Sequence, residues 1–358
     1  MCYYGGMTHL HGYLLFLLFR LPAAFLLDIL FGDPRWVPHP VVLFGRMITH
    51  LERLYRAVFP KSRWGERLAG AALAATMCVY SFAVPLLVLY VLLYLGLRYN
   101  MRALVIAGYA LDVFWGWQCL AARSMRDEAE HVYIQVSRSV FEGRAAVSRI
   151  VGRDTNMLDR AGVVRACLES VAESTTDGVI SPMLCYAAGG APLALLFKAV
   201  STMDSMVGYR NARYRSFGTV AARLDDFANL VGARLSALCM IVACVPLSVP
   251  ALFSRWAFRY RPLGAIRVFA RDRYRHQSPN SAQTEAVLAG ALGVQLAGDA
   301  WYEGKLERRP VLGDEARSVE TADIQRAVAL MYAASVLALL VITVVKALVM
   351  IRFYGIAV

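Results

Sequence analysis

One uncharged stretch constrains the fold of this chain more than any other feature. No charged residue occurs from Leu68 to Leu97, and at 1.5 Å per residue a helix of that length is longer than the roughly 30 Å hydrocarbon core of a bilayer. The composition agrees, because 58% of the 358 residues are hydrophobic and 18% are charged, against about 25% charged in ordinary soluble chains. A simple soluble enzyme and a disordered chain are therefore both excluded.

Several further runs are long and apolar enough to cross a membrane. The four strong runs are 10–27, 68–97, 103–122 and 327–345, and the two weaker runs are 178–197 and 235–253. The first weak run is interrupted by Gly189-Gly190-Ala191-Pro192, and the second contains Pro246 and Pro250, so we expect both to be re-entrant or packed against protein. The sequence thus predicts a single all-α, polytopic membrane domain with four to six membrane helices and large cytoplasmic helical loops.

The net charge of +12 is best explained as a topology signal. Arginines gather in 28–67, 123–165 and 255–275, between the apolar runs, and basic loops stay on the cytoplasmic side of a membrane. If both weak runs crossed, residues 199–234 would be placed outside, and if only one crossed, residues 254–326 would be. Four spans, with both weak runs failing to cross, keep every basic loop inside, and we favour that number. A basic soluble chain would suggest a nucleic-acid partner, but here we expect none.

The chain that follows the first apolar run is a rigid, irregular turn. Its sequence, Asp33-Pro34-Arg35-Trp36-Val37-Pro38-His39-Pro40, holds three prolines that stop a helix. This turn presents Asp33, His39 and, slightly later, Arg46 at the membrane face. The alternative is a capped helix end with interfacial Trp and Arg anchors.

Three acids follow at spacings of four. Residues 161–175 have a helix-forming composition, so Glu169, Glu173 and Asp177 would stack on one helical face. The three carboxylates would repel one another unless cations or a metal ion lay opposite them. Mg²⁺, which prefers oxygen ligands, would fit such a face. The alternative is a solvated acidic face.

A third segment combines oxygen ligands with arginines. After Asp204, one helical edge would carry Asp225, Asp226 and Asn229. The guanidinium groups of Arg210 and Arg215 have a geometry that fits phosphate. An acidic element beside an Arg-rich one is what a Mg²⁺–polyphosphate site needs, although a capped helix with solvated arginines has the same pattern. A later Ser278-Pro279-Asn280 turn could equally be a helix cap.

These motifs, in this order, resemble the CbiB/CobD family of adenosylcobinamide-phosphate synthases. The resemblance covers roughly residues 20–345 and rests on six segments: 27–41, 152–155, 169–178, 204–214, 223–229 and 278–280. After Ser-Pro-Asn, Ser281-Ala282-Gln283-Thr284 stands where the family usually has Ala-Gly-Trp-Pro.

The resemblance implies an integral membrane ligase of the bacterial cytoplasmic membrane, with active loops facing the cytoplasm. It would join adenosylcobyric acid to (R)-1-amino-2-propanol or its O-phosphate at the expense of ATP, with Mg²⁺ as cofactor. The corrinoid and the amino alcohol would be its substrates, and other cobalamin-pathway enzymes its protein partners. The sequence has no P-loop, so ATP would bind without one.

Residue chemistry then assigns the roles. The candidate catalytic residues are Glu169, Glu173, Asp177, Asp33 and His39; the candidate nucleotide and phosphate binders are Arg210, Asn211, Arg215, Arg46, Arg153, Asp154 and Asn280; the candidate metal ligands are Asp204, Asp225, Asp226 and Asn229. Two other functions stay open, a Mg²⁺-dependent membrane transferase of prenyl or alcohol phosphates and a non-enzymatic scaffold or transporter of the corrinoid pathway.

Overall fold

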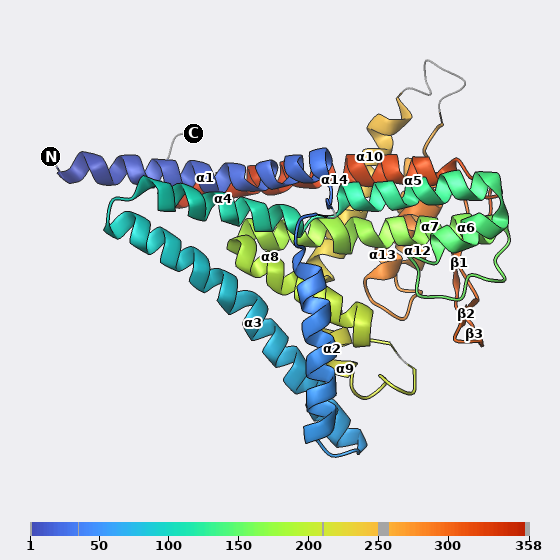
Figure 1. The fold of residues 1–358 in the computed structure, drawn as a ribbon. Helices are drawn as coiled ribbons and strands as arrows, with labels where there is room; N and C mark the ends of the chain where they lie inside the picture. The colour runs from blue at the N-terminus through green and yellow to red at the C-terminus, as the bar shows by residue number, and fades with distance from the viewer. Residues whose placement is uncertain (1, 35, 210, 250–257, 355–358) are drawn as a thin grey trace. The chain divides into compact units, whose positions relative to one another are not determined.

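The computed structural model describes residues 2–34, 36–209, 211–249 and 258–354. These residues are mostly helical with almost no sheet (Figure 1), which confirms the predicted all-α class. Among them, six segments are long and apolar enough to cross a membrane: Gly12–Phe31, Arg63–Arg98, Arg102–Arg138, Arg160–Val207, Leu230–Ser248 and Asp323–Phe353. Six is the upper end of the predicted range and exceeds the favoured four, because residues 178–197 of the first weaker run and residues 235–248 of the second lie within long apolar helical segments, while residues 250–253 lie outside the described residues.

The chain forms two compact units, and each is described by itself. Unit 1 comprises residues 1–120, 182–228 and 339–358, and unit 2 comprises 121–181 and 229–338. The helices of unit 1 are α1 (Cys2–Phe31), α2 (Pro40–Val58), α3 (Arg63–Arg98), α4 (Arg102–Gln118), α8 (Ser181–Val207) and α9 (Thr219–Ala228), followed by the end of α14 (Asp323–Tyr354).

The predicted uncharged stretch lies within α3. This helix begins at Ser62, whose side chain accepts a hydrogen bond from the Gly65 N–H at 3.1 Å and so satisfies one of the free N–H groups of the first turn. The helix continues through Pro85 and leaves large apolar side chains exposed, including Val79 and Leu87. Exposed apolar side chains along such a helix are what contact with lipid requires.

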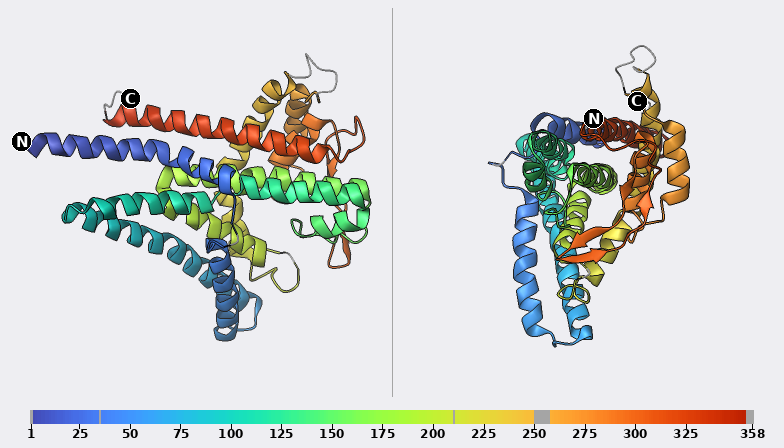
Figure 2. Two further views of the ribbon diagram at one scale, coloured as in Figure 1. Left: turned by 45° about the horizontal axis from the view of Figure 1, so that its top comes forward. Right: turned by 90° about the vertical axis from the view of Figure 1, so that its right-hand side faces the viewer.

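Helix α2 runs across the direction of α1. Of the residues between the two helices, 32–34 and 36–39 are described and are not helical, as the three prolines predicted. Figure 1 and the right-hand view of Figure 2 both show α2 turning away from the axis of α1.

Helix α8 is broken at Gly190, as the Gly-Gly-Ala-Pro run predicted. Gly190 has a φ of 67°, a left-handed conformation that glycine adopts without steric cost. A Cβ at this position would lie 2.7 Å from the Arg20 guanidinium. The break leaves carbonyl groups before it and N–H groups after it without helical partners.

Charged side chains from three other helices satisfy those groups. Arg20 of α1 donates to the Tyr186 carbonyl at 3.0 Å, and Lys346 of α14 donates to the Ala187 carbonyl at 3.1 Å. Asp112 of α4 accepts from the Ala191 N–H at 2.9 Å and pairs with Arg20 at 3.4 Å. Arg20 and Asp112, which lie within the apolar runs 10–27 and 103–122, therefore compensate one another and satisfy the free backbone groups at the break in α8.

Unit 2 combines helices with two short antiparallel ribbons. Its elements are α5 (Ala122–Arg138), α6 (Val140–Val147), α7 (Arg160–Ser174), the π-helix η1 (Thr175–Ile180), α10 (Leu230–Ser248), α12 (Pro262–Asp272), α13 (Ser281–Leu292), β1 (Leu296–Ala297), β2 (Ala300–Tyr302), β3 (Lys305–Glu307), β4 (Val311–Leu312) and the first part of α14. Strand β1 pairs with β4, placing Leu296 opposite Leu312, and β2 pairs with β3, placing Trp301 opposite Leu306. Every residue of α13 is buried, so this helix forms the centre of the unit.

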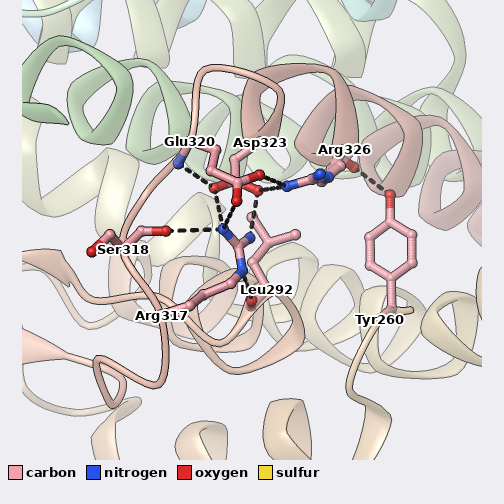
Figure 3. Close-up of polar contacts among 7 residues, drawn as sticks. All are labelled: Tyr260, Leu292, Arg317, Ser318, Glu320, Asp323 and Arg326. Atoms are coloured by element: carbon pink, nitrogen blue, oxygen red, sulfur yellow. Dashed lines mark hydrogen bonds and ion pairs between the residues drawn. The ribbon is translucent and has the colours of Figure 1, made fainter. Parts of the chain in front are cut away.

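An ion-pair network fixes the start of α14 in unit 2 (Figure 3). Asp323 is fully buried and pairs with Arg317 and with Arg326, the latter at 2.6 Å. Arg317 also donates to the Leu292 carbonyl at the end of α13, and Tyr260 donates to the Arg326 carbonyl at 2.8 Å. The network thus joins α14 to the end of the buried helix and gives Asp323 two compensating cations.

The pair in unit 1 leads to a stability prediction. Asp112→Asn leaves the Arg20 cation buried without its carboxylate, and loss of one partner of a buried pair costs about 3–5 kcal/mol in soluble proteins. We expect a loss of about 3 kcal/mol in the free energy of unfolding, measured by denaturant titration of the detergent-purified protein. Asp127→Asn is the control, because Asp127 is exposed and pairs with Arg123 across one helical turn; it should cost under about 1 kcal/mol. Equal losses in the two variants would contradict a role for the buried pair.

Candidate functional site

Unit 2 brings together most of the predicted acidic motif. Helix α7 begins as predicted, with the Asp159 side chain accepting from the Gly162 N–H at 2.7 Å. It carries Glu169 and Glu173 one turn apart on the same face. The third predicted acid, Asp177, lies instead in η1. A π-helix turn holds more residues than an α-helix turn, so the α-helical stacking expected for Asp177 is wrong.

Glu169 is a buried carboxylate with two partners. It forms an ion pair with Arg153, and its other oxygen accepts from the Ala297 N–H at 2.7 Å. The carboxylate in turn raises the pKa of the Arg153 guanidinium, against the opposing effect of burial. Ala297 has a φ of 59°, an uncommon conformation for a residue other than glycine, and the Glu169 hydrogen bond holds it there. Glu169 therefore joins the Gly152-Arg153-Asp154 segment to strand β1.

Glu173 is more accessible. It is exposed and accepts a hydrogen bond from the Ser281 hydroxyl at 3.0 Å. Ser281 is the first residue of the segment that departs from the family pattern. The next polar residue of that segment, Gln283, donates to the carbonyls of Arg273 and Pro279. The altered segment thus supplies a partner for Glu173 and closes the Ser-Pro-Asn turn.

A third acid, Glu285, completes the cluster and was absent from the predicted site residues. It lies one turn after Ser281 on the buried helix α13 and is only 5% exposed. Burial raises its pKa well above the ordinary value, and the nearby charges of Glu169 and Glu173 raise it further, while Arg153 and Arg309 act in the opposite direction. Glu285 is therefore a carboxyl group that favours its protonated form.

Basic and aromatic side chains surround these acids. His276 is half-buried, and its Nδ1 atom accepts from the Ser278 N–H at 3.0 Å; burial lowers its pKa, although Glu173 and Glu169 oppose that shift. Arg309 lies 4.5 Å from the centre of the Tyr302 ring, and burial raises the pKa of Tyr302. The resulting cluster of Arg153, Glu169, Glu173, His276, Ser281, Glu285, Tyr302 and Arg309 is called the Glu285 cluster below.

The two other binders predicted in unit 2 have structural partners. Asp154 accepts from the Gly304 N–H at 2.8 Å, and its own N–H donates to the Trp301 carbonyl, so it holds the turn between β2 and β3. Asn280 accepts from Arg234 at 2.9 Å. Both residues border the Glu285 cluster in sequence, but their contacts in this structure are internal.

In unit 1 the predicted pair Asp33 and His39 does meet. His39 Nε2 lies 3.4 Å from Asp33 Oδ1, while His39 Nδ1 accepts from the Val41 N–H at 3.2 Å. His39 is therefore the N-cap of α2, and the alternative interpretation of this turn as a helix cap is correct for that residue. Arg46, two turns into α2, lines a surface pocket with Val42, Gly45, Thr49, His50 and Met206.

The loop after α8 is held by an acid that sequence reasoning missed. Glu52 of α2 is buried, pairs with Arg56 at 3.1 Å and with Arg213 at 3.0 Å, and accepts from the Tyr214 hydroxyl. Arg213 is thus used within the protein. The predicted Asn211 accepts from the Tyr214 N–H at 3.0 Å, Arg215 is exposed, and Arg210 lies outside the described residues.

The predicted metal ligands are not gathered into one protein-only cage. In the part of the chain that the structure describes, no three His, Cys, Asp or Glu side chains lie close enough to hold an ion. Asp204 lies in the last turn of α8, and Asp225 and Asp226 lie in α9. Asn229, in unit 2, accepts from the Ser181 hydroxyl at 2.7 Å. Because Mg²⁺ is usually held by one or two carboxylates together with substrate phosphates, the adjacent Asp225 and Asp226 still provide fitting donors, and the four-residue ligand set stays a prediction.

Comparison with known proteins then defines the class. The family model described as CobD/Cbib protein matches residues 21–331, and the chain belongs to this family. A relative from Geobacter metallireducens, named cobalamin biosynthesis protein CobD, is 43% identical over 332 residues, covering 90% of this chain and 94% of the relative.

Other relatives are also named CobD or CbiB. A CobD protein of Pelobacter propionicus is 39% identical over 328 residues, covering 91% of this chain and 94% of the relative. The cobalamin biosynthesis protein CbiB of Salmonella typhimurium is 39% identical over 317 residues, covering 88% of this chain and 93% of the relative. No solved structure matches the chain.

The raised pKa of Glu285 predicts a pH dependence of stability. The unfolded chain releases this proton near the ordinary glutamate pKa, whereas the folded protein retains it to higher pH. Folding therefore loses stability as pH rises between those two values. Glu285→Gln removes this loss, so the melting temperature of the variant should rise relative to the parent from pH 5 to pH 8. Glu315→Gln, at an exposed position of the same unit, should show no such divergence. Parallel curves for Glu285→Gln and the parent would contradict the protonated buried acid.

Proposed function

We propose that this protein acts in cobalamin biosynthesis as an ATP-dependent ligase. It would form an amide between a carboxylate of adenosylcobyric acid and the amine of (R)-1-amino-2-propanol or its O-phosphate. The membership of the CobD/CbiB family supports the pathway. The observation that supports the reaction type is the Glu285 cluster, which combines an accessible carboxylate, a buried carboxyl group with a raised pKa and a guanidinium.

The chemistry needs such a set of groups. A carboxylate does not react with an amine until it is activated, most simply as an acyl phosphate made with the γ-phosphoryl group of ATP. The amine nitrogen then forms the C–N bond, the C–O bond to phosphate breaks, and phosphate leaves. Before the attack the ammonium form of the amino alcohol must lose a proton to a base.

In our proposal Glu173 is that base. It is exposed and oriented by the Ser281 hydroxyl, whereas Glu169 is committed to Arg153 and Ala297. Glu285 favours its protonated form, which makes it a hydrogen-bond donor. Glu169 is then a positioning residue, which differs from the catalytic role that we assigned to it from sequence.

ATP and Mg²⁺ belong to the proposal as cofactors. Bound Mg²⁺ would neutralise charge on the nucleotide phosphates, with Asp225 and Asp226 as the donors of this chain and Arg215 as an exposed cation for phosphate. The Asp33–His39 pair and Arg46 would face the corrinoid or the amino-alcohol phosphate.

The proposed setting is the bacterial cytoplasmic membrane, with the arginine-rich loops inside and other enzymes of the pathway as partners. Reporter fusions after residues 60, 150, 220 and 275 test the orientation, and all four should report a cytoplasmic position because each follows or lies in a basic segment. An external signal at 220 with an internal signal at 275 would mean that both weaker runs cross, and the proposed cytoplasmic position of residues 199–234 would be wrong.

An assay with the purified protein tests the reaction. ATP, Mg²⁺, adenosylcobyric acid and aminopropanol phosphate should give adenosylcobinamide phosphate, detected by mass spectrometry, with one ADP released per product. No product from a folded preparation, with either form of the amino alcohol, would overturn the ligase assignment.

Glu173→Gln tests the base. We expect kcat to fall about 100-fold, within the range that general-base catalysis contributes, and the deficit to shrink at high pH, where the amine loses its proton without help. Glu315→Gln is the control and should keep full activity. An active parent together with a fully active Glu173→Gln would show that the ligase is correct and the base is not Glu173.

A further inference from the structure

Helix α2 exposes a face whose side chains fall into two adjacent stripes. The apolar stripe consists of Leu43, Met47, Leu54 and Val58, and the basic stripe of Arg46, His50 and Arg53. At 100° per residue each set stays on its own side of the exposed face along the whole helix. Leu43, Leu54 and Val58 are between 48% and 69% exposed, so the apolar stripe is not absorbed by the protein core.

The opposite face of α2 is committed to the protein. Phe44, Ile48 and Glu52 are buried, and the helix packs on α3. The exposed stripes are therefore held in a fixed orientation, because the buried face cannot rotate outward without losing the Glu52 ion pairs.

The position of α2 in unit 1 favours a lipid surface as the occupant of this face. Only residues 32–39 separate α2 from α1, which is a candidate membrane span. Figures 1 and 2 show α2 running across the direction of α1. If α1 crosses the bilayer, α2 therefore runs along its surface.

The composition of α2 agrees with a surface position. It is not among the segments apolar enough to span, yet an amphipathic helix with basic residues beside a hydrophobic stripe is typical of helices in the membrane interface. Trp36, before the helix, and Trp64, after it, are 85% and 72% exposed, and exposed tryptophans are enriched at that level of a membrane.

We propose that α2 lies in the membrane–water interface, with its apolar stripe among the upper acyl chains and Arg53 of its basic stripe on the phosphates of anionic lipids. Arg53 provides a charge that attracts such lipids, whereas Arg46 keeps the substrate role proposed above. This assignment does not depend on the reaction that the protein catalyses. It would keep the Asp33–His39 turn, which precedes α2, at the membrane surface.

A lipid-borne quencher tests the contact directly. Leu54→Cys, in the apolar stripe, and Leu306→Cys, a comparably exposed position on β3, are labelled with bimane in reconstituted vesicles, with the signal of the parent protein subtracted. Phosphatidylcholine that carries a nitroxide near its headgroup should quench the label at 54 several-fold more than the label at 306. Equal quenching at both positions would overturn the proposal. So would a label at 54 that neither the nitroxide lipid nor aqueous iodide reaches, because a second copy or another protein would then cover the stripe.

The preference for anionic lipid is tested by composition and charge. Replacing phosphatidylcholine with phosphatidylglycerol should increase quenching at position 54, and high salt should reverse the increase. Arg53→Gln should diminish it, whereas Arg308→Gln, at an exposed position of the β3–β4 connection, should not. Arg53 is chosen because Arg46 is assigned to substrate in the proposed function. Quenching that ignores both phosphatidylglycerol and Arg53→Gln would overturn the role of the basic stripe.

Discussion

The structure depends on ion pairs between charged side chains that are buried among apolar helices, where the dielectric constant is low. An isolated buried charge is far more costly than a paired one. In unit 1 the pair of Arg20 and Asp112 meets this requirement and also satisfies the groups that the break in α8 leaves open. In unit 2 Asp323 is neutralised by Arg317 and Arg326 (Figure 3). The first pair joins helices that are distant in sequence, and the second network joins α14 to the end of α13.

The Glu285 cluster differs from these networks in one respect. Glu169 has its guanidinium partner in Arg153, but Glu285 meets two like charges in addition to burial, and both effects raise its pKa. Perturbed groups of this kind gather at functional sites, although structural networks produce them as well. The accessible Glu173 in the same cluster is consistent with the role that we propose for it.

Several features could be predicted from local sequence. The uncharged run predicted α3, the three prolines predicted the end of α1, and the glycines before Pro192 predicted the break in α8. The Glu169–Glu173 spacing predicted a shared helical face, and α7 provides it. The same rule failed at Asp177, because nothing local in the sequence signals that the helix widens into a π-turn there. Likewise, the type and position of His39 predicted a catalytic residue, but in the structure its Nδ1 atom caps α2.

The sequence by itself determined the class of the molecule, since apolar length, charge patterning and ordered motifs are local properties that hydrophobicity and backbone sterics convert directly into helices. The tertiary structure alone decided which charges meet. Glu285 and Glu52 carry no distinguishing sequence signal, and their roles depend in part on residues over a hundred positions away in the chain, such as Glu169 for Glu285 and Arg213 for Glu52. The pKa of a carboxyl group and the partner of an arginine depend on burial and on distances between residues in the folded chain. The order of residues in the sequence does not specify these quantities.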